Sequence, residues 1–241
     1  MFTNAFTSEA LNEALAVVRS EFLMGIWETL YVTVLSTLFA CVLGLPLGVL
    51  LVAGDKNGVL PLPAPIMSAL NVIINILRSV PFLILMIMVF PLSRALIGTT
   101  IGTKASIVPL VIASFPFVAR LVEGSLREVN PNIIEAAQSM GASPLQIIVK
   151  VMIPESIPSL ISNVTIAITT ILSYSAMSGI IGGGGLGKIA INYGYYRYKY
   201  LIMLFAVILL VLMVQMFQTI GTRLAVKADK RLKSSASRKK K

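Results

Sequence analysis

The sequence predicts an all-α integral membrane protein with five membrane-spanning helices and one structured loop between them. Hydrophobic residues make up 56% of the 241 residues, whereas charged residues make up only 12%. The mean hydropathy of +0.89 excludes an ordinary soluble domain. The formal net charge of +10 would suit a nucleic-acid partner in a soluble protein, but residues 223–241 hold nine basic residues and one acid. The body of the chain is therefore apolar and nearly neutral.

Stretches without charged side chains locate the spans, because about 20 apolar residues cross the hydrocarbon core as a helix. We expect transmembrane helices near residues 27–53, 66–91, 105–126, 159–180 and 201–222. The chain then divides into an amphipathic N-terminal segment, a membrane domain that contains the loop, and a basic tail. These parts cover residues 1–26, 27–222 (with the loop at 127–158) and 223–241.

The distribution of basic residues predicts the orientation of the chain. An odd number of spans places the two termini on opposite sides of the membrane. With the C-terminus inside, 13 basic residues are cytoplasmic and six are external, the asymmetry that the positive-inside rule describes. We therefore expect the N-terminus outside and the C-terminus in the cytoplasm, where the tail suits anionic lipid headgroups and not nucleic acid.

The N-terminal segment is typical of a surface helix and not of a cleaved signal. It carries acidic residues and lacks a basic start followed by an apolar core. Leu11, Leu15, Val18 and Phe22 recur at helical spacing. This pattern favours an amphipathic helix on the extracytoplasmic surface of the membrane.

Composition excludes several kinds of chemistry. The chain has no histidine, and its one cysteine, Cys41, cannot form an internal disulfide. Without histidine the usual zinc sites and His-based triads are excluded. Residues 182–188 resemble the start of a phosphate-binding loop, but Ile189 stands where that motif needs Ser or Thr. We therefore predict no catalytic residue, no metal site and no ATP site in this chain, and a tight turn at the glycine run.

Two short helices are predicted within the loop. Asn130 and Pro131 fit an N-cap and a first helical position, and Gly141 suits the left-handed residue that ends the helix. Ser143 and Gln146 have the spacing of a capping box at the start of a second helix. That helix is expected to end at two prolines that lead into the fourth span, Pro154 and Pro158.

The loop also carries the motif by which a family is identified. The motif consists of Glu135-Ala136-Ala137, three intervening residues, Gly141, and Val-Met-Ile-Pro ending at Pro154. It resembles the "EAA" motif of ABC importer permeases. In that family the motif forms a knob that docks into the cytoplasmic ATPase subunit. The resemblance implies ATPase-coupling roles for Glu135, Ala136, Ala137, Gly141, Ser143 and Pro154.

Further motifs narrow the resemblance to the methionine uptake family, which carries D- and L-methionine. They are the segments at 78–82 (RSVPF), 107–109 (IVP), 174–179 (YSAMSG), 184–187 (GGLG) and 193–195 (YGY), within a match from about residue 25 to 218. The resemblance implies a type I permease core, a coupling-helix loop and a homodimer in a bacterial inner membrane. It implies as partners two cytoplasmic ATP-binding subunits, which hold the ATP and Mg, and an extracytoplasmic substrate-binding (lipo)protein. No cofactor is expected on this chain.

The candidate residues of the translocation pathway or its gates lie in the second and fourth spans. They are Asn75, Arg78, Pro81, Tyr174 and Met177. A cation within a span costs about 3 kcal/mol or more and usually faces an interior or a water-filled path. Asn71, Asn75 and Arg78 form one polar helical face, which fits either a pathway face or a structural role beside the bend at Pro81. We expect Tyr174 and Met177 near the outer gate.

Two other functions remain open from the sequence. The same kind of importer permease could serve another amino acid or small ligand, because selectivity in such systems lies largely in the binding protein. A stand-alone secondary transporter is less favoured, because such proteins usually show inverted repeats or intramembrane acids, and neither is visible here.

Overall fold

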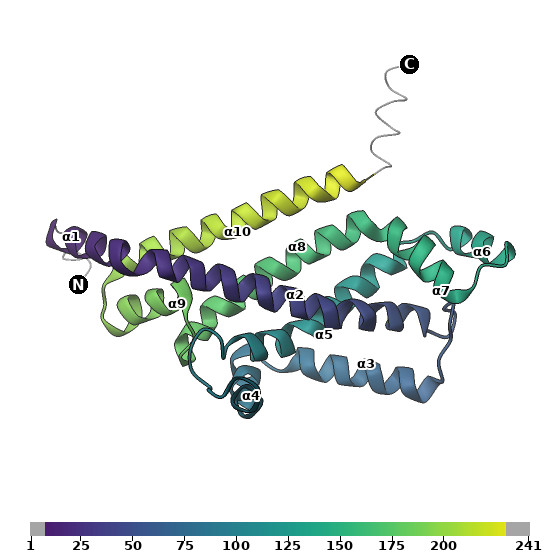
Figure 1. Ribbon diagram of the computed structural model, residues 1–241, viewed down its shortest axis with the longest axis horizontal. Helices are drawn as coiled ribbons and strands as arrows, with labels where there is room; N and C mark the ends of the chain where they lie inside the picture. Colours follow the sequence, from purple (N-terminus) through teal and green to yellow (C-terminus); the bar gives the residue numbers. More distant parts are fainter. Residues whose placement is uncertain (1–7, 230–241) are drawn as a thin grey trace, which may run out of the picture. The chain divides into compact units, whose positions relative to one another are not determined.

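The computed structural model describes residues 8–229, which form helices and turns without a strand (Figure 1). The α-helices are α1 (Ser8–Val17), α2 (Leu23–Ala53), α3 (Ala64–Ser79), α4 (Phe82–Ile97), α5 (Ile107–Arg127), α6 (Pro131–Ser139), α7 (Pro144–Ile147), α8 (Ile153–Ser178), α9 (Gly185–Ile189) and α10 (Tyr200–Ala228). Wider π-helical turns occupy Val18–Phe22, Ile148–Met152 and Ala190–Tyr196, and a 3-10 turn occupies Gly179–Ile181. Of the predicted basic tail, residues 230–241 lie outside the described range.

The chain divides into two compact units, which are described separately below. The first unit comprises Met1–Leu38, Val80–Ala113 and Ile168–Phe217. The second unit comprises Phe39–Ser79, Ser114–Ala167 and Gln218–Lys241.

Four helical stretches within the described range are long and apolar enough to cross a membrane. They are Ser8–Ala53, Ile107–Arg127, Pro144–Ile181 and Tyr200–Ala228. The predicted span at 66–91 is not one continuous helix, because α3 and α4 are separated by a sharp bend. Pro81 lacks an N–H donor and disfavours a helical residue before it, so the chain breaks at Val80 and Pro81. The predicted count of five spans holds when this bent pair counts as one.

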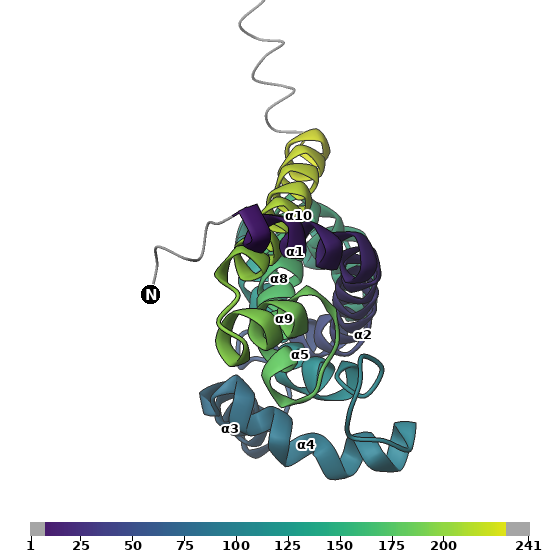
Figure 2. The same cartoon turned by 90° about the vertical axis from the view of Figure 1, so that its left-hand side faces the viewer.

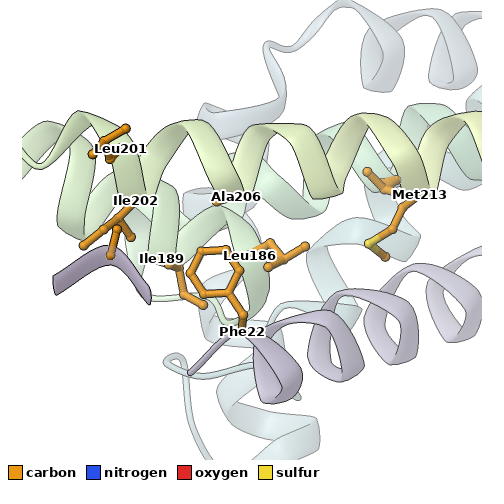
Figure 3. Packing of buried hydrophobic residues seen from close by; sticks show 9 residues of the cluster. Phe22, Leu186, Ile189, Leu201, Ile202, Ala206 and Met213 are labelled. Atoms are coloured by element: carbon orange, nitrogen blue, oxygen red, sulfur yellow. The ribbon is translucent and has the colours of Figure 1, made fainter. Parts of the chain in front are cut away.

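The core of the first unit joins the N-terminal helix to α9 and α10. Phe22, Leu186, Ile189, Ile202 and Met213 are buried in one cluster (Figure 3). Figure 2 shows α1 beside the first turns of α10. Burial of this apolar surface, at about 25 cal/mol per Å², stabilises the packing of these helices.

The buried face of α1 differs from the predicted stripe. Ala14 is fully buried and Phe22 nearly so, whereas Leu11 and Leu15 are exposed. The helix continues through a π-helical turn into α2, and this wider turn changes which side chains share a face. The small Ala14 therefore faces α10 in place of the leucines.

The end of the glycine run, where α9 begins, is held by two side chains of α2. Gly182 and Gly185 have φ angles of +89° and +79°, which only glycine adopts readily. Glu28 Oε2 accepts a hydrogen bond from the Gly185 N–H at 2.7 Å, and Thr29 Oγ1 accepts one from the Leu186 N–H at 2.9 Å. These amide groups, which a phosphate-binding loop would offer to its ligand, are occupied by side chains of α2.

In the second unit, α2 and α5 pack closely through small residues. A Cβ atom on Gly44 would lie 2.7 Å from the Val118 side chain, and one on Gly48 would lie 2.6 Å from Ala119 O and Val122 Cβ. Gly44 and Gly48 are four residues apart, the spacing by which glycine lets two membrane helices approach. This contact fixes α5 against the end of α2.

The segment after α7 departs from the sequence prediction. Pro154 and Pro158 do not end the helix that begins at Pro144; the helix runs on through a π-helical turn into α8. Ile153 donates its N–H to Ile148 O across that turn. Pro154 and Pro158 each remove one donor from the ladder, and the Ser156 and Ser162 hydroxyl groups bond to the Met152 and Pro158 carbonyls. The prolines therefore shape a continuous helix.

Candidate functional site

The first coupling helix, α6, begins with the predicted cap. Asn130 Oδ1 accepts a hydrogen bond from the Asn132 N–H at 3.0 Å, and Pro131 occupies the first helical position. Such a cap stabilises a helix end by about 1 kcal/mol. The start of α6 is thus fixed by its own sequence.

The end of α6 is a complete Schellman motif at Gly141. The Gly141 N–H donates to Gln138 O at 2.9 Å, and the Ala142 N–H donates to Ala137 O at 3.1 Å. Gly141 has a φ of +79°, as predicted, and a Cβ atom there would meet no atom within 4 Å. Backbone conformation, and not crowding, therefore limits which residue can replace Gly141.

The capping box at α7 is also confirmed. The Ser143 N–H donates to Gln146 Oε1 at 2.9 Å, and the Gln146 N–H donates to Ser143 Oγ at 3.4 Å. Two capped helices joined by a four-residue turn make a stiff projection, which Figure 1 shows at the α6–α7 end of the second unit. Pro154 lies beyond it, exposed in the first turn of α8.

Apolar side chains on this projection face outward. Met140 is 81% exposed and Leu145 is 69% exposed, whereas Ala137 beside them is buried. Exposed large apolar side chains on a rigid projection are typical of a docking surface. Met140 and Leu145 were not among the predicted site residues, because the sequence alone does not distinguish an apolar residue on a docking surface from one in a core.

Glu135 lines a cavity of about 520 Å³ between α6 and the loop that follows α2. Asp55 and Arg127 line the same cavity. Among residues 8–229 the Glu135 carboxylate forms no hydrogen bond or ion pair, and the residue is exposed. It can therefore pair with a group that another chain supplies. Ala136 is exposed beside it, and Ala137 provides the close contact that the two alanines predict.

A network of charges joins α3, α5 and the loop after α2. Arg120 donates to Asn71 Oδ1 at 2.8 Å, to Asn75 Oδ1 at 3.0 Å and to Glu123 at 2.7 Å. The Glu123 carboxylate also pairs with Arg127 at 3.0 Å. Arg120 was not among the predicted site residues, because two of its partners, Asn71 and Asn75, lie far away in the sequence.

The network ends at Asp55, in the loop after α2. Arg127 Nη2 donates to Asp55 Oδ2 at 2.9 Å, and the Lys56 N–H donates to Asp55 Oδ1 at 2.7 Å. The guanidinium hydrogen bond from Arg127 lowers the pKa of Asp55, and the Lys56 N–H lowers it further. Asp55 is thus ionised and tied to the last residue of α5.

The polar face predicted on α3 is arranged differently from the prediction. Asn75 accepts its hydrogen bond from Arg120, and Arg78 forms no hydrogen bond or ion pair within the described residues. Arg78 is exposed in the last turn of α3, next to the break, and not in the middle of a continuous span. A structural role of Arg78 through an ion pair therefore has no partner within residues 8–229.

The other three pathway candidates lie in the first unit. The carbonyl of Pro81 accepts hydrogen bonds from the Ile84 and Leu85 N–H groups, both at 3.0 Å, and so caps the start of α4. The next residue, Phe82, stacks on Tyr174 with ring centroids 4.4 Å apart and planes 6° apart. Met177, one turn beyond Tyr174, is 38% exposed.

Comparison with known proteins identifies the family. The family described as "Binding-protein-dependent transport system inner membrane component" matches residues 44–233. The chain is 49% identical over 209 residues to the probable D-methionine transport system permease protein MetI of Vibrio cholerae, covering 87% of this chain and 92% of that one. The chain belongs to the family of inner membrane components of binding-protein-dependent transport systems. It is therefore a multi-pass inner-membrane permease subunit.

Solved structures share the fold of this permease. A chain of the inward-facing MetNI methionine ABC transporter is 41% identical, with a TM-score of 0.84 over 86% of this chain and 96% of that one. An amino acid ABC transporter crystallised with histidines has a TM-score of 0.66 over 87% of this chain and 93% of that one, at 22% identity. The predicted all-α, type I ABC importer permease fold is confirmed.

Proposed function

We propose that this permease is the membrane subunit of an ATP-driven importer that moves methionine into the cytoplasm by alternating access. The observation that carries the proposal is the 49% identity to a D-methionine permease over most of both chains, together with the 41% identity to the MetNI permease chain. The intact coupling loop supports the same mechanism, since each cap that its motif requires is formed.

The proposed assembly is a homodimer of the permease with two cytoplasmic ATP-binding subunits and an extracytoplasmic substrate-binding (lipo)protein. Docking of the projection into an ATP-binding subunit is supported by the exposed Met140 and Leu145 and by Glu135, whose carboxylate has no partner within residues 8–229. ATP and Mg would bind to that partner, and this chain would supply no cofactor site of its own. The proposed orientation places the N-terminus outside and the basic tail beside anionic lipid in the cytoplasm.

The coupling loop would transmit motion through rigid contacts. Because both ends of α6 and the start of α7 are capped, a force on the projection moves it as one piece. Arg127 joins α5 to Asp55, and Arg120 joins α5 to α3. Closure of the ATP-binding subunits would thereby reach α3, whose last turn carries Arg78.

The gating roles of the pathway candidates are also part of this proposal. Tyr174 and Met177 would contribute to the outer gate, and Arg78 would maintain the bend between α3 and α4 and the inward gate. Cysteines at 174 and 177 should change in accessibility between resting and ATP-trapped states. Unchanged accessibility at both positions would contradict the gate assignment, and Arg78→Ala with normal stability, transport and ATPase coupling would contradict that of Arg78.

The alternative cargo is another amino acid or small ligand. The likeness to the histidine-bound transporter, at 22% identity, shows the fold alone and favours no cargo. Calorimetric titration of the cognate binding protein with methionine decides this question, because that protein would set selectivity. If the binding protein bound another ligand tightly and did not bind methionine, the alternative cargo would be favoured. If the permease transported without any ATP-binding subunit, a stand-alone transporter would be favoured.

Substitution of Gly141 tests the docking of the coupling loop. Gly141→Asp should leave the chain in the membrane but release the ATP-binding subunit, because it places a carboxylate on the docking surface. Gly141→Asn is the matched control, since Asn has the same size without the charge and tolerates a left-handed φ. Co-purification of the ATP-binding subunit and substrate-stimulated ATPase activity are the measurements. Normal assembly of the Asp variant would contradict the docking assignment.

A further inference from the structure

A groove of about 500 Å³ lies in the first unit, beside the first turns of α2. One wall is a single face of α2, because Met24, Trp27, Glu28 and Tyr31 occupy positions i, i+3, i+4 and i+7. The other wall is the loop between α4 and α5, which contributes Ile101 and Lys104. None of these residues has a role in the coupling loop or among the proposed gate residues.

The loop wall of the groove is fixed by hydrogen bonds. The Gly102 N–H donates to Gly182 O at 2.8 Å, which ties the loop to the glycine run. The Ile101 N–H donates to Thr99 Oγ1 at 3.1 Å. The α2 wall is fixed as well, since Glu28 Oε2 accepts a hydrogen bond from the Gly185 N–H. Hydrogen bonds within the first unit therefore hold both walls of the groove in place.

The apolar part of the groove faces outward. Trp27 is 63% exposed and Ile101 is 68% exposed, and Met24 beside them is also exposed. In an inner-membrane protein, exposed Trp and Tyr at the end of an apolar span lie at the level of the lipid headgroups, because their rings are apolar and their N–H or O–H groups are polar. Acyl chains are therefore the apolar material nearest to this face.

The polar part of the groove holds one charge of each sign. The Lys104 ammonium forms no hydrogen bond or ion pair within residues 8–229, and Glu28 Oε1 accepts none there. Phosphate is a strong acceptor for an ammonium group, and a carboxylate accepts hydrogen bonds from a primary ammonium. A headgroup that carries both a phosphate and an ammonium would satisfy both side chains.

We propose that this groove binds one phospholipid with a zwitterionic phosphate–ammonium headgroup, of the phosphatidylethanolamine class. Lys104 binds its phosphate, Glu28 accepts from its ammonium, and the acyl chains lie along Met24, Trp27 and Ile101. A free amino acid carries the same two charges, but it has no acyl chain to cover the exposed tryptophan and isoleucine. The membrane setting follows from the family, and the leaflet follows from the proposed orientation.

The chain offers a built-in probe, because Trp27 is its one tryptophan. The full-length permease, assembled with its partner subunits, is placed in bilayers of phosphatidylcholine containing increasing fractions of phosphatidylethanolamine with brominated acyl chains. Subtracting the fluorescence of the Trp27→Phe assembly isolates the Trp27 signal from that of the partners. Brominated phosphatidylglycerol and brominated phosphatidylcholine serve as the comparison lipids.

We expect phosphatidylethanolamine to quench Trp27 with a relative association constant at least about threefold above phosphatidylcholine, as one charge-assisted hydrogen bond provides. Glu28→Gln should reduce this ratio to about one, because Glu28 is the group that accepts from the primary ammonium, and the Gln amide oxygen can still accept from the Gly185 N–H. Lys104→Gln should weaken the association of both lipids, because both carry a phosphate. Arg94→Gln is the control, since Arg94 is an exposed cation of the same unit that does not line the groove, and it should keep the full ratio.

Three outcomes would overturn the proposal. Equal quenching by all three lipids would show ordinary boundary lipid only, and preference for phosphatidylglycerol would show attraction to Lys104 without a role for Glu28. Relief of quenching by millimolar free methionine would assign the groove to an amino acid instead. Because transport of methionine is a separate measurement, loss of the lipid preference leaves the proposed function untouched.

Discussion

The two units of the permease hold their helices together by different physical means. The first unit relies on an apolar cluster around Phe22 and Leu186, and on side chains of α2 that cap the backbone of α9. The second unit adds charged side chains to the close packing of α2 on α5, with Arg120 and Arg127 joining three elements. The first arrangement combines non-directional packing with a few exposed directional contacts, such as the Lys199–Glu13 ion pair, whereas the charge network of the second depends on several matched donors and acceptors.

The two units should therefore differ in how their stability responds to substitutions. Apolar packing loses stability in proportion to the area removed, so small substitutions in the first unit have graded effects. A partly buried charge network fails abruptly, because removal of one member leaves the others without partners. The coupling loop belongs to the second unit, in which Glu135 and Arg127 share a cavity. A unit that must move as one piece benefits from such directional links.

The largest effect is expected from Arg120→Met in the second unit. It leaves the amide oxygens of Asn71 and Asn75 without their donor and Glu123 with Arg127 alone, at a cost of about 2 to 3 kcal/mol. Hydrogen exchange should rise in peptides from α3 and the end of α5 but stay unchanged in peptides covering α9. Arg223→Met, at an exposed arginine of the same unit, is the control. If Arg120→Met raised hydrogen exchange equally in peptides of both units, the second unit would not depend on this charge network more than the first does.

Thr29→Val should have the next largest effect, this time in the first unit. Valine keeps the size of threonine but cannot accept the Leu186 N–H, which is then buried without a partner at a cost of about 1 to 2 kcal/mol. Thr37→Val is a matched control, because Thr37 is also buried in α2 and bonds only to a carbonyl of its own helix, Thr33 O. Thermal unfolding of the two variants measures the difference. Equal destabilisation would mean that the contact to α9 contributes nothing.

The parts of the fold that follow local rules were predictable from the sequence. The caps at Asn130 and Ser143 and the left-handed Gly141 depend on residues within five positions of one another, and the structure has all three. The break at Pro81 had a local signal too, but hydrophobicity alone continued the span across it. Capping chemistry therefore located helix ends better than hydropathy did.

Contacts between distant residues were not predictable. Arg120 bonds to Asn75, 45 positions away, and Glu28 to Gly185, 157 positions away. A single sequence read without an alignment contains no signal for such pairs. Arg78 was therefore predicted as the functional cation of α3, although Arg120 is the cation that binds Asn71 and Asn75. The exposure of Met140 was not predicted for another reason. An apolar residue on a docking surface is of the same type as a residue in a core, so its type alone does not reveal its exposure.

A smaller effect is expected at the aromatic stack of the first unit. A double-mutant cycle of Phe82→Leu and Tyr174→Leu should give a coupling energy of about 0.5 to 1.5 kcal/mol, because stacked rings contribute beyond their buried area. Unfolding in detergent supplies the four stabilities. A coupling energy of zero would show that the two rings act as separate apolar groups, with the stack adding no directional contact to this unit.

The smallest effect is expected from titration of Asp55, the exposed end of the charge network. Its pKa is lowered in the folded protein, so its contribution is present at neutral pH and is lost as the pH falls below about 4 toward the lowered pKa. The pair with Arg127 is solvent-exposed, and exposed pairs contribute at most about 1 kcal/mol. Asp55→Asn should therefore flatten the acid limb of the stability profile slightly, while Asp229→Asn, at the end of α10, serves as the comparison. An unchanged acid limb in Asp55→Asn would show that the network effectively ends at Glu123, and that the second unit relies on directional contacts only where they are partly buried.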